Sequence, residues 1–188
     1  MTRTRVGYAG GKKEKPTYKS LGKHTEAIEL QFDPTKISYE ELLWVFWKAH
    51  DPTSKPWGTQ YKNVLWTHGE AQAKAAKASA AALAKKLGEP VRTEIAAAPR
   101  FWVAEDYHQK YYLRRHDHVI FYAFGEEKDE AAFRDSEIAA RLNGWVGGHG
   151  TLADRKRETE RLKLSSDVVS ALAVALGERP PPTCGEPE

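Results

Sequence analysis

Residues 27–32 read Ala27-Ile28-Glu29-Leu30-Gln31-Phe32, and this stretch decides the fold class of the chain. Apolar side chains alternate with polar ones here, which is the period of a strand with one buried face. Asp33-Pro34 follows as a turn. Ser38 and Glu41 then have the spacing of a capping box, which predicts that a helix begins beside them. A half-buried strand followed closely by a helix favours a fold that contains both.

The remainder of the chain continues this mixture of strands and helices. Strands are expected near residues 63–67 and 91–95, and helices near residues 70–87, 104–115, 129–142 and 167–176. The helix after Ser38 is apolar on nearly every side, so we expect it to be largely buried. Residues 119–124 are too short an apolar run to separate a buried strand from continued packing. Since strands and helices do not alternate regularly, we expect an α+β fold in a single domain, with helices packed on a mixed sheet as a two-layer sandwich.

Composition limits the class of protein. The chain has 188 residues, 40% of them hydrophobic, and a net charge of +3. Such a chain can bury a sizeable core, and its charge is too balanced to indicate a nucleic-acid or membrane surface. Cys184 is the only cysteine, which excludes an internal disulfide and fits a reducing compartment, so we expect a cytoplasmic protein. The Pro-rich residues 178–188 around Cys184 are expected to be disordered.

Short motifs of unusual composition occur in a fixed order along the chain. They are Arg3-Thr4-Arg5-Val6-Gly7-Tyr8-Ala9-Gly10-Gly11, Pro16-Thr17-Tyr18, His24-Thr25-Glu26, His50-Asp51-Pro52-Thr53, Gly58-Thr59-Gln60-Tyr61 and Ala104-Glu105-Asp106-Tyr107-His108-Gln109-Lys110-Tyr111. In this order the motifs resemble the A-type peptide methionine sulfoxide reductases, thiol enzymes that repair oxidised methionine in proteins. Residues 141–151 are similar to a C-terminal extension in one branch of that family. The resemblance implies a reductase-like domain over residues 1–153, a helical extension over residues 154–177 and the tail 178–188.

Sulfoxide reduction needs a thiolate that attacks sulfur, an acid that protonates the departing oxygen and an apolar pocket for the methyl group. The resemblance implies that Glu26 is this acid and that the hydroxyls of Tyr18 and Tyr111 donate hydrogen bonds to the oxygen. Asp106 would help to position the site. The segments that form the substrate-binding wall would contribute His50, Asp51, Gly58 and Tyr61.

Each of these residues also has an ordinary structural explanation. A glutamate at the start of a strand is usually a solvated end group, although burial there would favour its protonated form. A tyrosine is often a core residue with a hydrated hydroxyl, and Asp106 would suit the first turn of a helix. Tyr18 matches the family less firmly than Glu26, because the segment between the two is shorter than in many relatives.

The nucleophile is the main departure from the family. Relatives carry it in a Gly-Cys-Phe-Trp-Gly segment and a strand that precede the Arg-Val-Gly-Tyr stretch, whereas this sequence has only Cys184. We therefore expect that an N-terminal strand is missing, that the true start lies upstream, and that this chain as it stands does not turn over. Two alternatives remain open: a non-catalytic protein that binds methionine sulfoxide or a protein partner, and a degenerate fragment. For Cys184 a free thiol is the simpler interpretation.

The resemblance also implies partners and cofactors. It implies no bound cofactor, thioredoxin or another dithiol as the external reductant, and proteins or peptides that contain methionine sulfoxide as substrates. His116-Asp117-His118 alternates two histidines but lacks further ligands, so a solvated loop is favoured over a metal site. Lys12-Lys13-Glu14-Lys15 is a short charged loop that indicates phosphate or nucleic-acid binding only weakly.

Overall fold

The computed structural model of the chain describes residues 1–55 and 58–178. Cys184 and all but the first residue of the tail 178–188 lie outside the described residues. The chain divides into two compact units. The first contains residues 5–105 together with Met1, and the second begins at Asp106 and includes residues 2–4.

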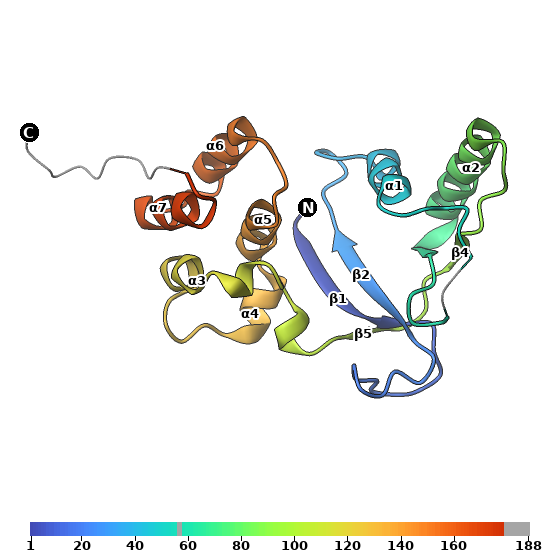
Figure 1. Ribbon diagram of the computed structural model, residues 1–188, viewed down its shortest axis with the longest axis horizontal. Coiled ribbons are helices and arrows are strands. Elements are labelled where there is room, and N and C mark those ends of the chain that lie inside the picture. Colours follow the sequence, from blue (N-terminus) through green and yellow to red (C-terminus); the bar gives the residue numbers. More distant parts are fainter. Residues whose placement is uncertain (56–57, 179–188) are drawn as a thin grey trace, which may run out of the picture. The chain divides into compact units, whose positions relative to one another are not determined.

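The first unit contains a three-stranded sheet in the order β2-β1-β5 (Figure 1). Its strands are β1 (Arg3–Ala9), β2 (Thr25–Gln31) and β5 (Phe101–Val103). Strand β1 runs antiparallel to β5, with Gly7 opposite Val103. Gly7 is required there, since a Cβ atom would lie 2.2 Å from the carbonyl oxygen of Trp102. The expected strand over residues 27–32 is therefore β2, at an edge of this sheet.

A second, two-stranded sheet lies in the same unit. Strands β3 (Val64–Thr67) and β4 (Glu94–Ala97) are parallel and are connected through α2 (Gly69–Leu87), which packs against both. A helical crossover of this kind is the usual way to join parallel neighbours. Helix α2 ends at Gly88 in the left-handed conformation with φ of 75°, as its position after residues 70–87 predicted.

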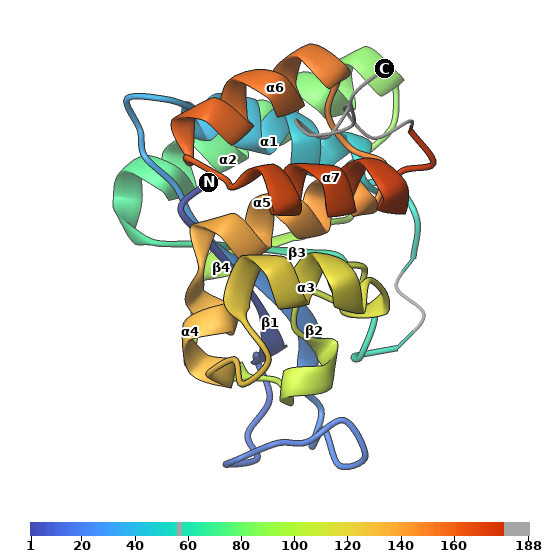
Figure 2. The same ribbon diagram turned by 90° about the vertical axis from the view of Figure 1, so that its left-hand side faces the viewer.

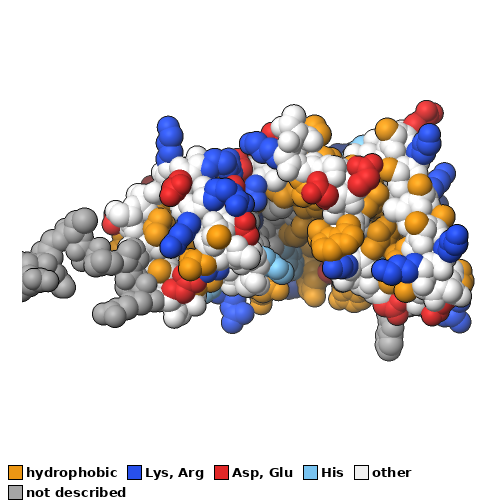
Figure 3. Space-filling view, turned by 90° about the horizontal axis from the view of Figure 1, so that it is seen from above, with side chains coloured by type: hydrophobic (Ala, Val, Ile, Leu, Met, Phe, Trp, Pro, Cys, Tyr) orange, Lys and Arg blue, Asp and Glu red, His pale blue; other side chains and the backbone are white. Residues whose placement is uncertain are grey.

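Helix α1 (Tyr39–Lys48) begins with the predicted capping box, in which Ser38 and Glu41 each accept from the other's backbone N–H. The expectation that this helix is largely buried is wrong. Leu43 is its buried residue, whereas Trp44 is 61% exposed and Val45 is 54% exposed. The helix packs against α2, and apolar side chains including Trp44 and Val45 remain on the surface of the first unit (Figure 3). The ammonium group of Lys48 lies 3.6 Å from the ring centre of Trp44 and partly covers it.

From Asp106 onward the described part of the second unit is helical (Figure 2), and it has its own core. Its elements are η1 (Asp106–His108), η2 (Leu113–Arg115), α3 (Asp117–Phe124), α4 (Glu130–Asp135), α5 (Glu137–Val146), α6 (Leu152–Arg161) and α7 (Ser166–Ala175). Helix α7 packs against α3 and α5. The buried core residues are Leu113, Val119, Ile120, Phe133, Ala139, Leu142, Trp145, Val168 and Leu172.

Several expected elements of this unit differ in the structure. Residues 104–115 form two short 3₁₀ turns and not one helix, because Lys110 between them has a φ of 54°. Residues 119–124 belong to helix α3, which settles the alternative left open by their short apolar run. The helix expected over residues 129–142 is divided at Ser136, whose side chain caps α5 by accepting from the N–H of Ala139 at 3.1 Å. Helix α5 then continues through Asn143-Gly144 to Val146, since a glycine weakens a helix without ending it.

The predicted α+β class is confirmed, although the strands that we expected in one mixed sheet fall into two sheets. Among the described residues, no helix is both long enough and apolar enough to cross a membrane.

Shortening a core side chain should destabilise the helical unit. Leu142 is completely buried in the core cluster, so Leu142→Ala should lower the free energy of unfolding by about 2–5 kcal/mol. Leu152, at the start of α6, is 53% exposed and is the matched control, for which we expect a change within about 0.5 kcal/mol. Urea unfolding followed by circular dichroism would measure both. Equal losses for the two variants would contradict the assignment of this core.

The stability of the helical unit should also depend on pH through Glu130. The Arg114 guanidinium and the Lys128 ammonium donate to its carboxylate and lower its pKa to about 2, and both cations lie near the ring of Phe133. Because the pKa of Glu130 is lower in the folded state, its carboxylate adds to the free energy of unfolding. This contribution is fully present above the ordinary pKa of 4.5 and is lost as the pH falls toward 2. Because the side chain is 37% exposed, we expect a loss of only about 1 kcal/mol. Unfolding measured between these pH values should show a smaller loss in Glu130→Gln than in the unaltered protein.

Candidate functional site

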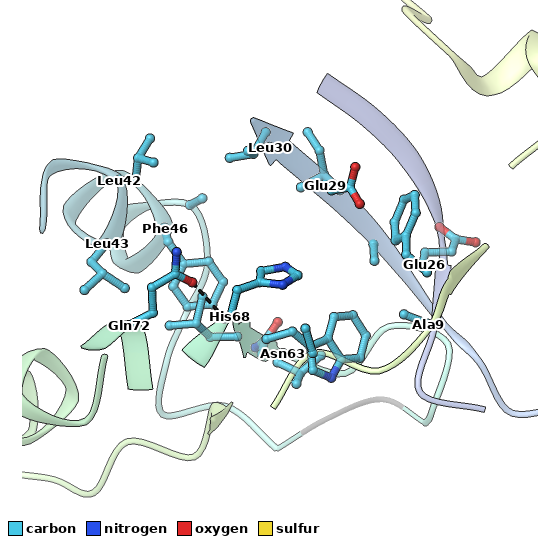
Figure 4. A pocket seen from close by; sticks show the side chains of 18 of the residues that line it. Ala9, Glu26, Glu29, Leu30, Leu42, Leu43, Phe46, Asn63, His68 and Gln72 are labelled. Carbon is cyan, nitrogen blue, oxygen red and sulfur yellow. Dashed lines mark hydrogen bonds between the residues drawn. The ribbon is translucent and has the colours of Figure 1, made fainter. Parts of the chain in front are cut away.

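A cavity of about 420 Å³ lies in the first unit between β2 and β3, next to α1 (Figure 4). Its volume is in the range of sites that bind small ligands or single side chains. The apolar side chains that line it include Ile28, Leu30, Leu43, Phe46, Leu65 and Trp66. Glu26 at the start of β2 also lines the cavity and places a carboxylate beside this apolar surface.

The start of β2 is held by the segment that precedes β3. The backbone N–H of Glu26 donates to the carbonyl of Gln60 at 3.0 Å, and the hydroxyl of Thr25 donates to the carbonyl of Thr59 at 2.7 Å. These bonds bring the Gly58-Thr59-Gln60-Tyr61 motif to the His24-Thr25-Glu26 motif, although 34 positions separate Thr25 from Thr59. The resemblance to the reductases predicted that both motifs contribute to one site.

A polar cluster results from this attachment. The side-chain amide of Gln60 donates to Glu26 Oε1 at 2.7 Å and lies 3.0 Å from the hydroxyl of Tyr61. Loss of hydration raises the pKa of Tyr61, and the negative charge of Glu26 and a hydrogen bond with Tyr18 raise it further. Tyr61 therefore keeps its proton at neutral pH and can donate a hydrogen bond. Three predicted site residues, Tyr18, Glu26 and Tyr61, thus lie together.

Glu26 itself is exposed, as is usual for a glutamate at the start of a strand, and the partial burial that would favour its protonated form is not observed. The reason lies in the sheet. Beyond the bond to Gln60, the outer edge of β2 borders the cavity and not another strand, and Ile28 on the same strand is 60% exposed.

Glu105 is a site residue that the sequence reasoning did not single out. One oxygen of its carboxylate accepts from the backbone N–H of Tyr18 at 2.9 Å, and the other accepts from the hydroxyl of Tyr8 at 2.7 Å. Tyr8 is only 2% exposed, so its hydroxyl needs a partner within the protein. A tyrosine in the buried strand indicates that its hydroxyl has a hydrogen-bond partner. The partner is Glu105, which is 97 positions away, so the local sequence around Tyr8 does not identify it.

Other predicted wall residues have structural partners of their own. Both ring nitrogens of His50 are occupied, by the carbonyl of Phe46 and by the hydroxyl of Thr93, each at 2.9 Å. Asp51 accepts from the hydroxyl and the N–H of Thr53, which lower its pKa, and so closes a local turn. Gly58 has a φ of 97°, and an added Cβ would meet nothing within 4 Å. His50 lines the cavity with Glu26, while Asp51 and Gly58 do not.

Asp106 and Tyr111 belong to the second unit. Asp106 begins η1, and its carboxylate lies 4.0 Å from the guanidinium of Arg134. Tyr111 is 58% exposed and packs edge-on against Tyr112, with 5.8 Å between the ring centres. Across the described ranges, no group of three or more potential metal-ligating side chains comes together, and His116-Asp117-His118 stands at the start of α3.

Solved structures of methionine sulfoxide reductases resemble the chain. The methionine sulfoxide reductase A of Corynebacterium diphtheriae is 34% identical, with a TM-score of 0.51 over 59% of this chain and 62% of that one. Reduced Mxr1 from Saccharomyces cerevisiae is 29% identical, with a TM-score of 0.56 over 59% of this chain and 70% of that one. These likenesses support the α+β assignment.

The sequence comparisons agree with the structural ones. A peptide methionine sulfoxide reductase from Drosophila melanogaster is 38% identical over 88% of this chain and 67% of its own length. The peptide methionine sulfoxide reductases MsrA of Methanosarcina acetivorans and Streptomyces griseus are 45% and 46% identical, over 65% and 55% of their own lengths. The chain thus spans between about half and two thirds of these curated relatives.

Two family assignments cover most of the sequence. Residues 128–172 match the helical domain of selenoprotein methionine sulfoxide reductase A, which corresponds to much of the second unit. Residues 1–140 match the family named peptide methionine sulfoxide reductase. This match covers more than half of the chain and includes every predicted site residue, so the chain belongs to the peptide methionine sulfoxide reductase family.

Proposed function

We propose that this protein acts on methionine-(S)-sulfoxide in proteins and peptides, as a member of a family that repairs oxidised methionine. The observation that carries the proposal is the cluster of Glu26, Gln60 and Tyr61 beside an apolar cavity. A sulfoxide presents a strongly accepting oxygen and an apolar methyl group on the same sulfur. The cluster offers hydrogen-bond donors to the oxygen, and the cavity offers apolar contact to the methyl group.

The roles of the side chains follow from their chemistry. Tyr61 is protonated at neutral pH like any tyrosine, and its raised pKa does not change this, so it can donate to the sulfoxide oxygen together with Tyr18. Glu26 in its acid form would give a proton to that oxygen as it leaves sulfur. By family resemblance, Tyr111 is a further donor and Asp106 helps to orient the site. By the same resemblance His50, Asp51 and Gly58 shape the wall on which the substrate rests, and of these three His50 lines the cavity.

Reduction itself requires a thiolate. In the proposed reaction the thiolate forms a bond to the sulfoxide sulfur while the oxygen takes up a proton, and the sulfur–oxygen bond breaks as hydroxide leaves. Water then attacks the thiol sulfur and breaks its bond to the methionine sulfur, which releases methionine and leaves the thiol as a sulfenic acid. A dithiol such as thioredoxin would then reduce the sulfenic acid and release water. The described residues contain no cysteine, and Cys184 is the only cysteine of the sequence. We therefore propose that the chain of 188 residues binds and polarises the sulfoxide but does not reduce it.

Binding can be tested without turnover. Tyr61→Phe removes one donor and should weaken binding of a peptide that contains methionine-(S)-sulfoxide by about three- to tenfold. Binding of the same peptide with methionine should not change. Tyr122→Phe, at a tyrosine of α3 that is 48% exposed, is the matched control and should bind like the unaltered protein. Isothermal titration would measure these affinities. A sulfoxide peptide that binds no better than the methionine peptide would refute the proposed substrate.

Turnover is the second test. Incubation of the 188-residue protein with dithiothreitol and the sulfoxide peptide should yield no methionine peptide by mass spectrometry, because none of the described residues can supply a thiolate. If methionine is formed, the proposal that this chain only binds is wrong. The variant Cys184→Ser would then show whether Cys184 supplies the thiolate, since it should abolish the reaction.

A further inference from the structure

A loop rich in lysine connects β1 to β2, and the proposed function leaves its charge unexplained. We call residues 12–23 the lysine loop. It carries five lysines, Lys12, Lys13, Lys15, Lys19 and Lys23, and one acidic residue, Glu14. All five lysines are exposed. The whole chain has a net charge of +3, so the remainder of the protein is close to neutral and the loop is its concentrated positive region.

The lysine loop is held in a defined shape by the buried imidazole of His24, which is 1% exposed. Its Nδ1 accepts from the backbone N–H of Gly11 at 3.1 Å, and its Nε2 lies 2.8 Å from the carbonyl oxygen of Lys13. Thr17 and Ser20 exchange two backbone hydrogen bonds of 2.9 and 3.3 Å within the loop. The lysines are therefore presented by an ordered framework and not by a free chain.

Among the described residues, no carboxylate oxygen lies within 4.0 Å of the amino groups of the five loop lysines, and Lys13 donates to the hydroxyl of Ser20. Lys62 and Lys128 differ in this respect. Lys62 pairs with Glu94 at 2.8 Å, and Lys128 pairs with Glu130 at 2.8 Å. Unpaired like charges on one short loop repel one another and attract an anionic partner.

The position of the loop indicates which partner it serves. Tyr18 lies within it, and Glu26 follows Lys23 after two residues. Tyr18 lies near enough to Tyr61 to form a hydrogen bond with it, so the loop that carries the lysines reaches the candidate site. We propose that the lysine loop binds acidic residues that flank the oxidised methionine, so that the protein prefers methionine sulfoxide in acidic segments of polypeptide. The part of this inference that concerns the sulfoxide rests on the proposed function.

A polypeptide fits these observations better than a nucleic acid. Binding to a phosphate backbone normally uses basic side chains spread along a groove or an extended face. Here five lysines stand on one short loop whose Tyr18 lies at a site for a single side chain. Flexible acidic side chains on either side of the methionine match that arrangement.

The experiment compares labelled peptides by fluorescence anisotropy. Methionine sulfoxide is flanked by aspartate, by serine or by lysine, and binding is measured in 50 mM and in 500 mM salt. At low salt we expect the aspartate peptide to bind at least about fivefold more tightly than the serine peptide. At high salt the difference should largely disappear, because ions screen exposed charges. Equal binding of the three peptides at low salt would overturn the proposal.

Two variants with the same change in net charge test whether the preference for the aspartate peptide comes from the lysine loop. The loop variant replaces four lysines with glutamine and keeps Lys13, which bonds to Ser20. Its substitutions are Lys12→Gln, Lys15→Gln, Lys19→Gln and Lys23→Gln. The control variant makes the same exchange at exposed lysines of α2, as Lys74→Gln, Lys77→Gln, Lys85→Gln and Lys86→Gln. The loop variant should lose the preference for the aspartate peptide and the control should keep it. Equal losses in both would assign the preference to net charge and contradict the role of the loop.

Further arms separate this inference from the proposed function and from a nucleic-acid role. With unoxidised methionine in each peptide, the preference for aspartate should persist at weaker overall affinity. If the preference persists but oxidation makes no difference, the proposed function fails and the role of the loop stands. If oxidation matters but flanking charge does not, the role of the loop fails alone. Competition by a short single-stranded DNA of matched charge as strong as that by the aspartate peptide would overturn the assignment to polypeptide.

Discussion

The candidate site depends on the carboxylate of Glu105. Its two oxygens accept from the buried hydroxyl of Tyr8 and from the backbone N–H of Tyr18. Tyr8 belongs to β1, in the middle of the three-stranded sheet, and Tyr18 belongs to the lysine loop. One ionised group thus satisfies a polar atom of the core and fixes a loop at the site. Hydrogen bonds to a charged acceptor are stronger than those to a neutral one, which suits a connection between parts so distant in sequence.

A second constraint brings the remaining side chains to the same place. The N–H of Glu26 donates to the carbonyl of Gln60 at the start of β2. Further along β2 the cavity begins, and residues of β2 and of β3 line it. Near this bond the chain provides polar side chains, and further along the cavity it provides apolar ones such as Leu65. A substrate with an accepting oxygen and an apolar methyl group needs both kinds of surface side by side.

The sequence predicted the local elements well where one short-range signal was sufficient. The capping box of Ser38 and Glu41 and the left-handed Gly88 mark the ends of helices, because the residues that form each cap are neighbours in sequence. The burial of α1 was not predictable in this way. Trp44 and Val45 are apolar but exposed, since burial depends on what packs against a helix and not on its own composition. The division of α4 from α5 at Ser136 was missed because a serine can also lie inside a helix.

For the site, too, the sequence did not identify a contact between residues that are far apart in the chain. Family resemblance identified Tyr18, Glu26 and Tyr61, and the structure brings these three together, but it did not identify Glu105. That carboxylate makes no contact with the cavity and works by holding another residue, so its importance appears only once the chain has folded. A residue that positions a site can be recognised only when its partners, which are distant in sequence, are known. A residue that touches the substrate can be recognised from the chemistry of its own side chain.

Charge is the property that connects this framework with selectivity. The imidazole of His24 holds the lysine loop from inside through hydrogen bonds with its backbone, and no carboxylate of the described residues pairs with the loop's ammonium groups. If salt bridges within the loop held its shape, the same ammonium groups would not be available to an external anionic partner. Because His24 bonds to the backbone of Gly11 and Lys13, the side chains of Lys12, Lys15, Lys19 and Lys23 are not part of these hydrogen bonds, whereas the Lys13 side chain also bonds to Ser20. Shape and charge are therefore separable in this loop, and a related chain could keep the same site while it alters which flanking residues it attracts.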